Sequence, residues 1–348
     1  MAILLTGGCG FIGSHQAVVL LDAGHEVVLV DDLSNSRASV VARISAITGS
    51  EPALHVHDVR DVDRLSNLMA SIDCEAIIHF AGMKHVAESV ERPIDYLDAN
   101  IGGLTSVLQA ADQVGVRRLI FSSSGSVYGP SIRFPIPEHA PKAPTNPYSL
   151  SKSLCEDLLE SVCACDTSWS VVALRYFNPA GAHPSGLIGE DPTQLASNVL
   201  PVIMEAAARR RASVPIFGTD LATPDGTAVR DFVHVMDVAE AHRRALDLLE
   251  SPGFEVLNIG RGVGVSVREL IAATARVIGQ PLPTIDCEPR PGDVPALYAA
   301  TDRAERRLGR WDYRGLDDIC RDAWRFRTNA RPGAVIPSPV VAPDEAGS

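Results

Sequence analysis

A glycine-rich turn near the start of the chain limits its fold more than any other feature. An apolar strand over residues 2–5 leads into Gly7, Gly10 and Gly13, and a helical pattern follows. Glycines in this setting let the backbone approach a pyrophosphate closely, and the helix N-terminus meets the phosphate charge. Asp31 ends the next predicted strand, about 20 residues on, where a carboxylate bonds an adenosine ribose. The sequence therefore predicts a dinucleotide site. The carboxylate favours NAD because it would repel the extra phosphate of NADP.

Short apolar runs alternate with helical patterns through the first half of the chain. Further strands are predicted at 53–56, 76–80, 119–121 and 171–174, and helices at 62–71, 94–114 and 148–165. This alternation predicts an α/β protein with a doubly wound parallel sheet, the Rossmann fold, and helices on both faces.

The chain changes character after Asn178, where Pro, Gly and Asp become frequent, and this indicates a second, smaller α/β substrate domain. We predict an NAD-binding domain over residues 1–178 with returning segments near 231–260, and a discontinuous substrate-binding domain over 179–330, mainly 179–230 and 261–330. Residues 331–348 are rich in Pro, Ala and Gly without periodicity, which predicts a flexible tail.

A tyrosine and a lysine stand four residues apart, at Tyr148 and Lys152. This spacing puts both on one face of a helix, and Thr145 or Asn146 followed by Pro147 is typical of a helix start. A positive charge nearby favours the phenolate of a tyrosine, which would make it a proton acceptor near neutral pH. The pair alone also fits an ordinary amphipathic helix, but the glycine turn in the same domain favours the catalytic interpretation.

Composition narrows the possible partners. The formal net charge of -12 argues against a nucleic-acid partner, and no apolar run is long enough to cross a bilayer. Seven scattered cysteines and an N-terminus that enters its first strand at once predict a cytoplasmic protein with reduced thiols. No metal site is predicted: His79, His183 and His234 lack ligand spacing and are interpreted as structural, and Cys163 and Cys165 as core residues.

Seven segments, in order between residues 1 and 326, carry a family resemblance. They read Gly-Gly-Cys-Gly-Phe-Ile-Gly at 7–13, His-Phe-Ala-Gly-Met-Lys at 79–84, Ser-Ser-Ser at 122–124, Tyr-Ser-Leu-Ser-Lys at 148–152, Asn-Pro-Ala-Gly-Ala-His-Pro-Ser-Gly at 178–186, Arg-Asp-Phe-Val-His-Val at 230–235 and Arg-Pro-Gly-Asp at 290–293. The chain resembles the extended short-chain dehydrogenase/reductase family and, within it, the UDP-glucose 4-epimerases.

The resemblance implies reversible epimerisation of UDP-glucose and UDP-galactose at C4, through a 4-keto sugar and with tightly bound NAD+. Tyr148 would take the proton of the 4-hydroxyl and Ser124 would bond the 4-oxygen. Lys152 would lower the pKa of the tyrosine and bond the nicotinamide ribose. A homodimer is implied through the helices at 94–114 and 148–165.

The resemblance also implies two sets of binding residues. Those for NAD are Gly7, Gly10, Phe11, Ile12, Gly13, Asp31, Asp32, Asn35, Ser36, Asp58, Val59, Phe80, Ala81, Gly82, Lys84, Asn100, Ser122, Tyr148, Lys152 and Phe177. Those for the UDP-sugar are Lys84, Ser124, Tyr148, Asn178, Asn198, Val199, Pro215, Ile216, Phe217, Arg230, Arg290, Asp293 and Leu297. In the second set the two arginines would clamp the diphosphate, Phe217 would border the uracil and Asp293 would meet the ribose.

Three departures or absences bear on rival functions. Ala99 replaces a family asparagine, and Leu297 at the sugar pocket leaves UDP-N-acetylhexosamines or UDP-pentoses open as main substrates. Gly125 and Ser126 stand where related dehydratases carry an acid pair and decarboxylases keep a glutamate, so both reactions are disfavoured. A non-catalytic NAD-sensing protein would be expected to lack Tyr148 or Lys152, and both are present.

Overall fold

The computed structural model describes residues 2–131, 133–191, 198–290 and 294–329. The predicted tail at 331–348 lies outside these residues.

Seven parallel strands form the central sheet, in the order β11-β6-β5-β4-β1-β2-β3. Their bounds are β1 Ala2–Thr6, β2 Glu26–Asp31, β3 Ala53–Val56, β4 Ala76–His79, β5 Arg118–Ser124, β6 Ser170–Tyr176 and β11 Gly253–Ile259. The doubly wound parallel sheet predicted from the sequence is confirmed. Its chain order reverses between β1 and β4, which is where ligands bind in such sheets.

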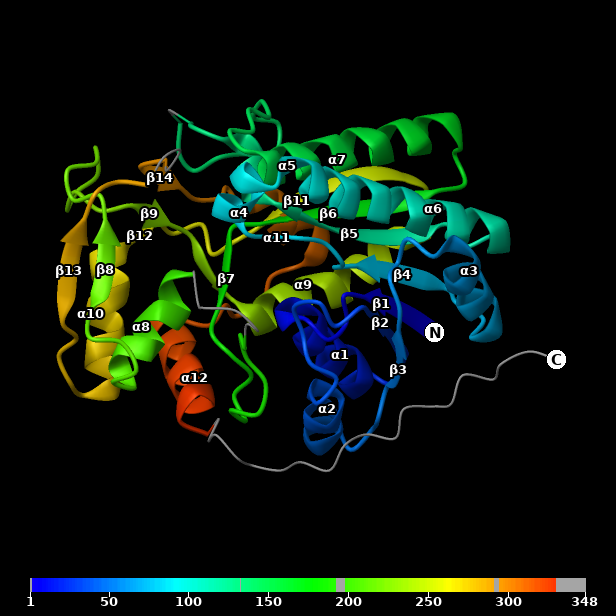
Figure 1. Cartoon of the computed structure of the whole chain (residues 1–348). Helices are drawn as coiled ribbons and strands as arrows, with labels where there is room; N and C mark the ends of the chain where they lie inside the picture. Colours follow the sequence, from blue (N-terminus) through cyan, green and yellow to red (C-terminus); the bar gives the residue numbers. More distant parts are fainter. Residues whose placement is uncertain (1, 132, 192–197, 291–293, 330–348) are drawn as a thin grey trace.

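Helices cover both faces of this sheet (Figure 1). On one face lie α1 Phe11–Asp22, α2 Val40–Thr48, α9 Val235–Ala245 and α11 Asp302–Leu308, and on the other α3 Val62–Ser71, α6 Gly103–Val114 and α7 Pro147–Cys165. All five residues of β1 are buried, because a strand covered on both sides has no solvent face. Burial on two faces explains why the strands read as continuous apolar runs.

The single helix predicted at 94–114 is wrong in detail. The chain forms α4 Val86–Glu91, α5 Pro93–Leu97, a π-helical turn η1 Asp98–Gly102 and then α6. The wider turn coincides with Asn100, whose buried side chain bonds Met83 and Ser151. A single π turn inside a helix is typical of functional sites, and helical periodicity does not reveal it.

A smaller α/β unit stands at the other end of the molecule (Figure 1). It contains β8 Val214–Phe217 paired with β13 Thr284–Cys287, and the helices α8 Val199–Ala207, α10 Val267–Ile278 and α12 Leu316–Asn329 around their own core. Ser266 and Glu269 form a capping box that starts α10.

Short strands connect this unit to the sheet. β7 Asn178–Ala180 pairs with β10 Phe232–His234, and β9 Val229–Arg230 lies between β12 Val265–Ser266 and β14 Ala296–Leu297. Two 3-10 turns, η2 Gly125–Tyr128 and η3 Leu246–Glu250, complete the elements. Among the residues described, no helix has both the length and the apolar character needed to cross a membrane.

Candidate active site

A cavity of about 820 Å3 opens at the carboxyl edge of the sheet. It begins at the glycine turn after β1, passes the ends of β4, β5 and β6, and reaches Arg230 on β9 and Leu297 on β14. Parallel strands end at one edge, so side chains far apart in the sequence meet there. The fold thus joins the glycine turn and the Tyr148–Lys152 pair in one space.

The glycine turn fits a pyrophosphate. Gly7 has a φ of +67°, and a Cβ added to it would lie 2.7 Å from the Ala81 amide nitrogen, while one added to Gly13 would lie 2.4 Å from the Gly7 carbonyl oxygen. No side chain caps the N-terminus of α1 at Gly10. The first amides of this helix therefore face the cavity and can bind an anion.

Asp31 at the end of β2 supports the same turn. Its carboxylate accepts hydrogen bonds from the Cys9 amide at 2.9 Å, the Leu33 amide at 2.9 Å and the Ser36 hydroxyl at 2.6 Å. Burial raises the pKa of Asp31, and these three bonds work against that rise. A carboxylate has room for about four hydrogen bonds, which leaves one position for a ribose hydroxyl.

Tyr148 stands in the first turn of α7 and faces Ser124 at the end of β5. Asn146 begins this helix by accepting from the Ser149 amide at 2.9 Å, and Pro147 follows it. Burial raises the pKa of Tyr148 above its usual value of about 10, and a hydrogen bond from Ser124 opposes the rise. The surroundings of Tyr148 thus raise its pKa, whereas the sequence predicted a lowered one.

Lys152 lies one turn further along α7 and is 6 % exposed. Its ammonium donates to the Ser122 carbonyl at 2.8 Å and stands 4.9 Å from the centre of the Phe121 ring. Burial lowers the pKa of Lys152. These contacts hold the ammonium against β5, and the buried side chain has little freedom to adopt other positions.

A buried ion pair holds α7 against β6. Glu156 on α7 receives Arg175 from β6 at 2.6 and 2.8 Å, and the Ser123 hydroxyl donates to the same carboxylate. Both charged side chains are at most 5 % exposed. Breaking such a pair leaves a buried charge unpaired, which costs about 3–5 kcal/mol. The pair therefore ties α7 to the sheet about two helical turns beyond Tyr148.

Most of the predicted site residues line the cavity. Of the NAD set all except Asn100 do so, and of the UDP-sugar set Lys84, Ser124, Tyr148, Asn178, Asn198, Val199, Arg230 and Leu297 do so. Asp293 lies outside the described residues.

Asn100 is not among the residues that line the cavity. Its amide bonds both backbone groups of Met83 and the Ser151 hydroxyl, and the side chain is 2 % exposed. Its neighbour Ala99 lines the cavity instead. Asn100 shapes the loop after β4, where a Cβ on Gly82 would lie 2.7 Å from the Asn100 amide oxygen, and its predicted contact with NAD stays a prediction.

The residues expected around uracil lie on and near β8, beyond the cavity wall. Ile216 is 1 % exposed and belongs to the core of the smaller unit. Pro215 and Phe217 lie on the opposite, half-buried face of the strand. The Arg290 guanidinium lies 4.0 Å from the centre of the Phe217 ring. Arg290 is thus stacked on an aromatic ring, and its predicted contact with phosphate stays a prediction.

The sequence did not predict several charged residues that line the cavity, among them Arg43, Glu190 and Asp191. Glu190 accepts from Lys84 and Asn198, and Asp191 pairs with Arg43 of α2 at 3.9 Å. Two consecutive acids directly after the glycine-rich stretch at 178–189 were the available signal.

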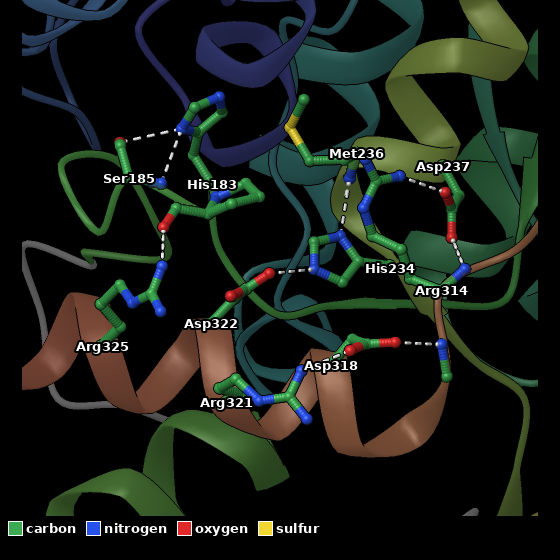
Figure 2. Close-up of polar contacts among 12 residues, drawn as sticks. His183, Ser185, His234, Met236, Asp237, Arg314, Asp318, Arg321, Asp322 and Arg325 are labelled. Carbon is green, nitrogen blue, oxygen red and sulfur yellow. Dashed lines mark hydrogen bonds and ion pairs between the residues drawn. The ribbon is translucent and has the colours of Figure 1, made fainter.

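The histidines have structural contacts. His79 bonds the Thr6 hydroxyl at 2.7 Å, His234 accepts from the Met236 amide at the start of α9, and His183 bonds Ser185 (Figure 2). Cys163 is buried as expected, but Cys165 is exposed, so its assignment to the core is wrong.

Comparison with known proteins agrees with this geometry. The family model described as "NAD dependent epimerase/dehydratase family" matches residues 3–260. The chain belongs to this family. NAD is accordingly its coenzyme, and the glycine turn, the uncapped α1 and Asp31 are the residues that fit it.

Individual relatives are similar over nearly the whole chain. The UDP-glucose 4-epimerase of Yersinia pestis is 44% identical over 94% of this chain and 98% of its own. The crystal structure of UDP-glucose-4-epimerase from Stenotrophomonas maltophila, with bound NAD and formylated UDP-arabinopyranose, has a TM-score of 0.92 and 44% identity over 94% of this chain and 98% of that one. The enzyme from Bifidobacterium longum, in complex with NAD+ and UDP, has a TM-score of 0.92 and 40% identity over 95% and 99%.

Proposed function

We propose that this protein interconverts UDP-glucose and UDP-galactose by reversible inversion at C4. The observation that carries the proposal is the junction of the glycine turn with Tyr148, Ser124 and Lys152 in one cavity that continues to Arg230. A coenzyme on the turn and a sugar beside the tyrosine would share this space. The relatives of known activity support the choice of a UDP-sugar.

The residues divide the reaction between them. The Tyr148 phenolate accepts the proton of the sugar 4-hydroxyl, and Ser124 holds the 4-oxygen by a hydrogen bond. Bound NAD+ supplies the hydride acceptor for C4 and later returns the hydride. Because the resulting 4-ketose turns over before it is reduced, the hydride reaches its opposite face and Tyr148 gives the proton back. No net oxidation occurs.

Lys152 contributes charge and position. Its ammonium is held between the Ser122 carbonyl and the Phe121 ring, one helical turn from Tyr148. A cation one helical turn away favours the phenolate, whereas burial raises the pKa of Tyr148. In this proposal Lys152 also bonds the nicotinamide ribose.

The nucleotide occupies the far half of the cavity in this proposal. Asn178, Asn198 and Val199 would bond phosphate or sugar groups, and Arg230 with Arg290 would clamp the diphosphate. Phe217, Pro215 and Ile216 would border the uracil, which requires Arg290 to leave its stacked position on Phe217. Leu297 would line the sugar pocket.

Elimination is disfavoured by the space around Gly125. A Cβ on this residue would lie 3.1 Å from the ring of Phe177. The acidic side chain that a dehydratase needs there would meet that ring, so the local packing supports epimerisation. A pentose nucleotide as a second substrate is favoured by the UDP-arabinopyranose derivative bound to the Stenotrophomonas enzyme.

Incubation of the purified protein with UDP-galactose, without added reductant, tests the proposal. We expect UDP-glucose to form, and the same final mixture to be reached from UDP-glucose, because the coenzyme is regenerated in each turnover. Separation of the nucleotide sugars measures the result, with free galactose as the control substrate. A dehydrated 4-keto-6-deoxy product, or no conversion, would contradict the proposal.

We also propose a homodimer, formed through an apolar surface on α4, α5 and α7. Val90 is 63 % exposed, Ile94 76 %, Leu150 40 % and Leu154 41 %, and the three helices pack against one another. Exposed apolar side chains gathered in this way mark interfaces. The seven cysteines are free thiols, which supports the further proposal of a cytoplasmic location.

Replacement of Ile94 by Asp is expected to convert the dimer to a monomer at micromolar concentration. A charge in the middle of an apolar interface must be desolvated without a partner. Light scattering during size-exclusion chromatography measures the mass. Ile285→Asp, at a 55 % exposed residue on β13, is the matched control and should leave the mass unchanged. A monomeric wild-type protein would refute the dimer.

A further inference from the structure

Glu190 occupies a position in the cavity where an anionic ligand would be expected. One carboxylate oxygen accepts from the Lys84 ammonium at 3.0 Å and from the Asn198 amide nitrogen at 2.6 Å. Lys84 comes from the loop after β4, and Asn198 from the start of α8. All three residues line the cavity, so a single internal carboxylate bridges its two sides.

The bond to Glu190 changes what Asn198 does for α8. Asn198 holds the N-cap position of that helix, yet its side chain makes no capping hydrogen bond. An asparagine at an N-cap ordinarily accepts from the amides of the first turn. Here its amide group donates to Glu190 instead, so the helix N-terminus carries no side-chain cap and a negative charge stands beside it.

The backbone that carries Glu190 is held from behind. The His183 amide donates to the Ile188 carbonyl at 3.0 Å, and Arg325 of α12 donates to the Pro184 carbonyl at 2.5 Å (Figure 2). Gly189 packs so closely on α12 that an added Cβ would lie 2.5 Å from the Phe326 ring. The Glu190 side chain is itself 12 % exposed. It is therefore placed by the fold rather than left free on the surface.

The pocket must treat two diphosphates differently if the proposed function holds. NAD has to stay through every turnover, whereas the UDP-sugar has to leave. Binding that is equally strong for substrate and product does not raise kcat, and it slows release. Glu190 competes for Asn198, which belongs to the substrate set alone, and for Lys84, which belongs to both sets, so it weakens the UDP-sugar more than NAD.

We propose that Glu190 is a specificity-determining residue that competes with the nucleotide diphosphate for Lys84 and Asn198, and so speeds release of UDP-sugars while NAD is retained. This inference rests on the proposed function, because it takes a UDP-sugar as the ligand. The carboxylate acts as an internal counter-ion of Lys84. The diphosphate displaces it on binding.

Glu190→Gln tests the inference, because glutamine keeps an oxygen acceptor for Asn198 but removes the charge. In protein that carries NAD, the Kd of UDP measured by calorimetry is expected to fall about fivefold, as removal of one nearby like charge predicts. KM for the UDP-sugar should fall similarly while kcat does not rise. The difference between variant and wild type should shrink at high salt. Uridine, which has no phosphate, should bind both proteins equally.

Glu205→Gln is the matched control. Glu205 also lies on α8 and pairs with Arg327, but it does not line the cavity, so this variant loses the same formal charge away from the ligand. Its Kd for UDP should equal that of the wild type.

Three results would overturn the inference. Glu190→Gln that binds UDP as the wild type does, or more weakly, would make Glu190 a structural ion pair only. Equal tightening for uridine would exclude the electrostatic cause. A wild-type protein that binds no UDP would remove the proposed function and the inference with it, whereas a wild-type protein that binds UDP and epimerises isolates the failure to Glu190.

Discussion

Tyr148→Phe is expected to lower kcat for UDP-galactose by a factor of about 10²–10⁴, the usual contribution of a positioned acid–base group. The substitution removes only the phenolic oxygen, which is the proposed proton acceptor beside Ser124. The ring stays at the N-terminus of α7, where the capping by Asn146 does not depend on it. The measurement is steady-state turnover of UDP-galactose, coupled to detection of UDP-glucose.

Two further measurements separate chemistry from folding in this variant. The NAD content of the purified protein, released by heat and quantified, should match that of the wild type, and so should the midpoint of unfolding. Tyr298→Phe is the control, since it also removes one hydroxyl but from a ring that stacks on Phe134 outside the cavity. Near-normal turnover of Tyr148→Phe, with NAD bound, would take the proton-acceptor role away from this residue.

The ionisation of Tyr148 shows what sequence spacing leaves out. Tyr-x-x-x-Lys predicts that both side chains share a helix face, and the structure places both at the cavity. Spacing says nothing about desolvation, and burial raises the pKa of the tyrosine in the ligand-free protein. The phenolate therefore depends on charge added to the site. The positive ring of bound NAD+ would supply such a charge, in addition to the ammonium of Lys152 that the site already holds.

Local patterns predicted the central sheet well because its inner strands are buried apolar runs and turn residues separate them. The strand at Ala53–Val56 and the helix at Val62–Ser71 have the bounds expected from the sequence. Elements set by tertiary bonds were not predictable in this way. The π turn at Asp98–Gly102 coincides with the bonds that Asn100 makes to Met83, in the loop after β4, and to Ser151 on α7. Neither contact can be read from the local pattern.

The same distinction between local patterns and tertiary bonds applies to the site residues. Residues on the glycine turn, β5 and α7 could be placed from the sequence because one strand or one helical turn fixes each of them. Glu190 could not, since its role depends on Lys84, 106 residues away, and on Asn198 across a loop. The uracil end also depends on an arrangement of β8 and Arg290 that pattern reasoning does not reach.

Acid is expected to destabilise the folded protein by about 4 kcal/mol between pH 7.5 and 5.5. His15, His79 and His242 are fully buried, and burial lowers the pKa of each from 6.5, to about 3 for His15 and His79 and about 4 for His242. Below pH 6.5 the unfolded chain binds protons at these residues while the folded chain stays neutral, so stability falls as pH falls. At pH 5.5 each histidine costs about 1.4 kcal/mol.

The contacts of these histidines explain why protonation is opposed. His79 faces the Lys152 ammonium, whose charge also lowers the pKa of His79, and His242 lies against Tyr176 and Phe80 on the inner face of α9. Buried carboxyls change the pH dependence of stability in the opposite direction. Burial raises the pKa of Asp31, Asp231 and Asp237, so the folded state takes up protons there and the loss of stability levels off at the acid end.

Urea unfolding at pH 7.5, 6.5 and 5.5, with equal NAD content, measures the predicted loss. The slope of unfolding free energy against pH reports the number of protons taken up on unfolding. In His79→Gln that slope should fall by up to about one third, whatever the variant does to stability at pH 7.5. One of the three histidines with the largest shifts is then gone, while His25, His85 and His183, whose pKa values are also lowered, still titrate. A free energy of unfolding that stays level between pH 7.5 and 5.5 would mean that these histidines are already protonated, or already accessible to water, in the folded protein.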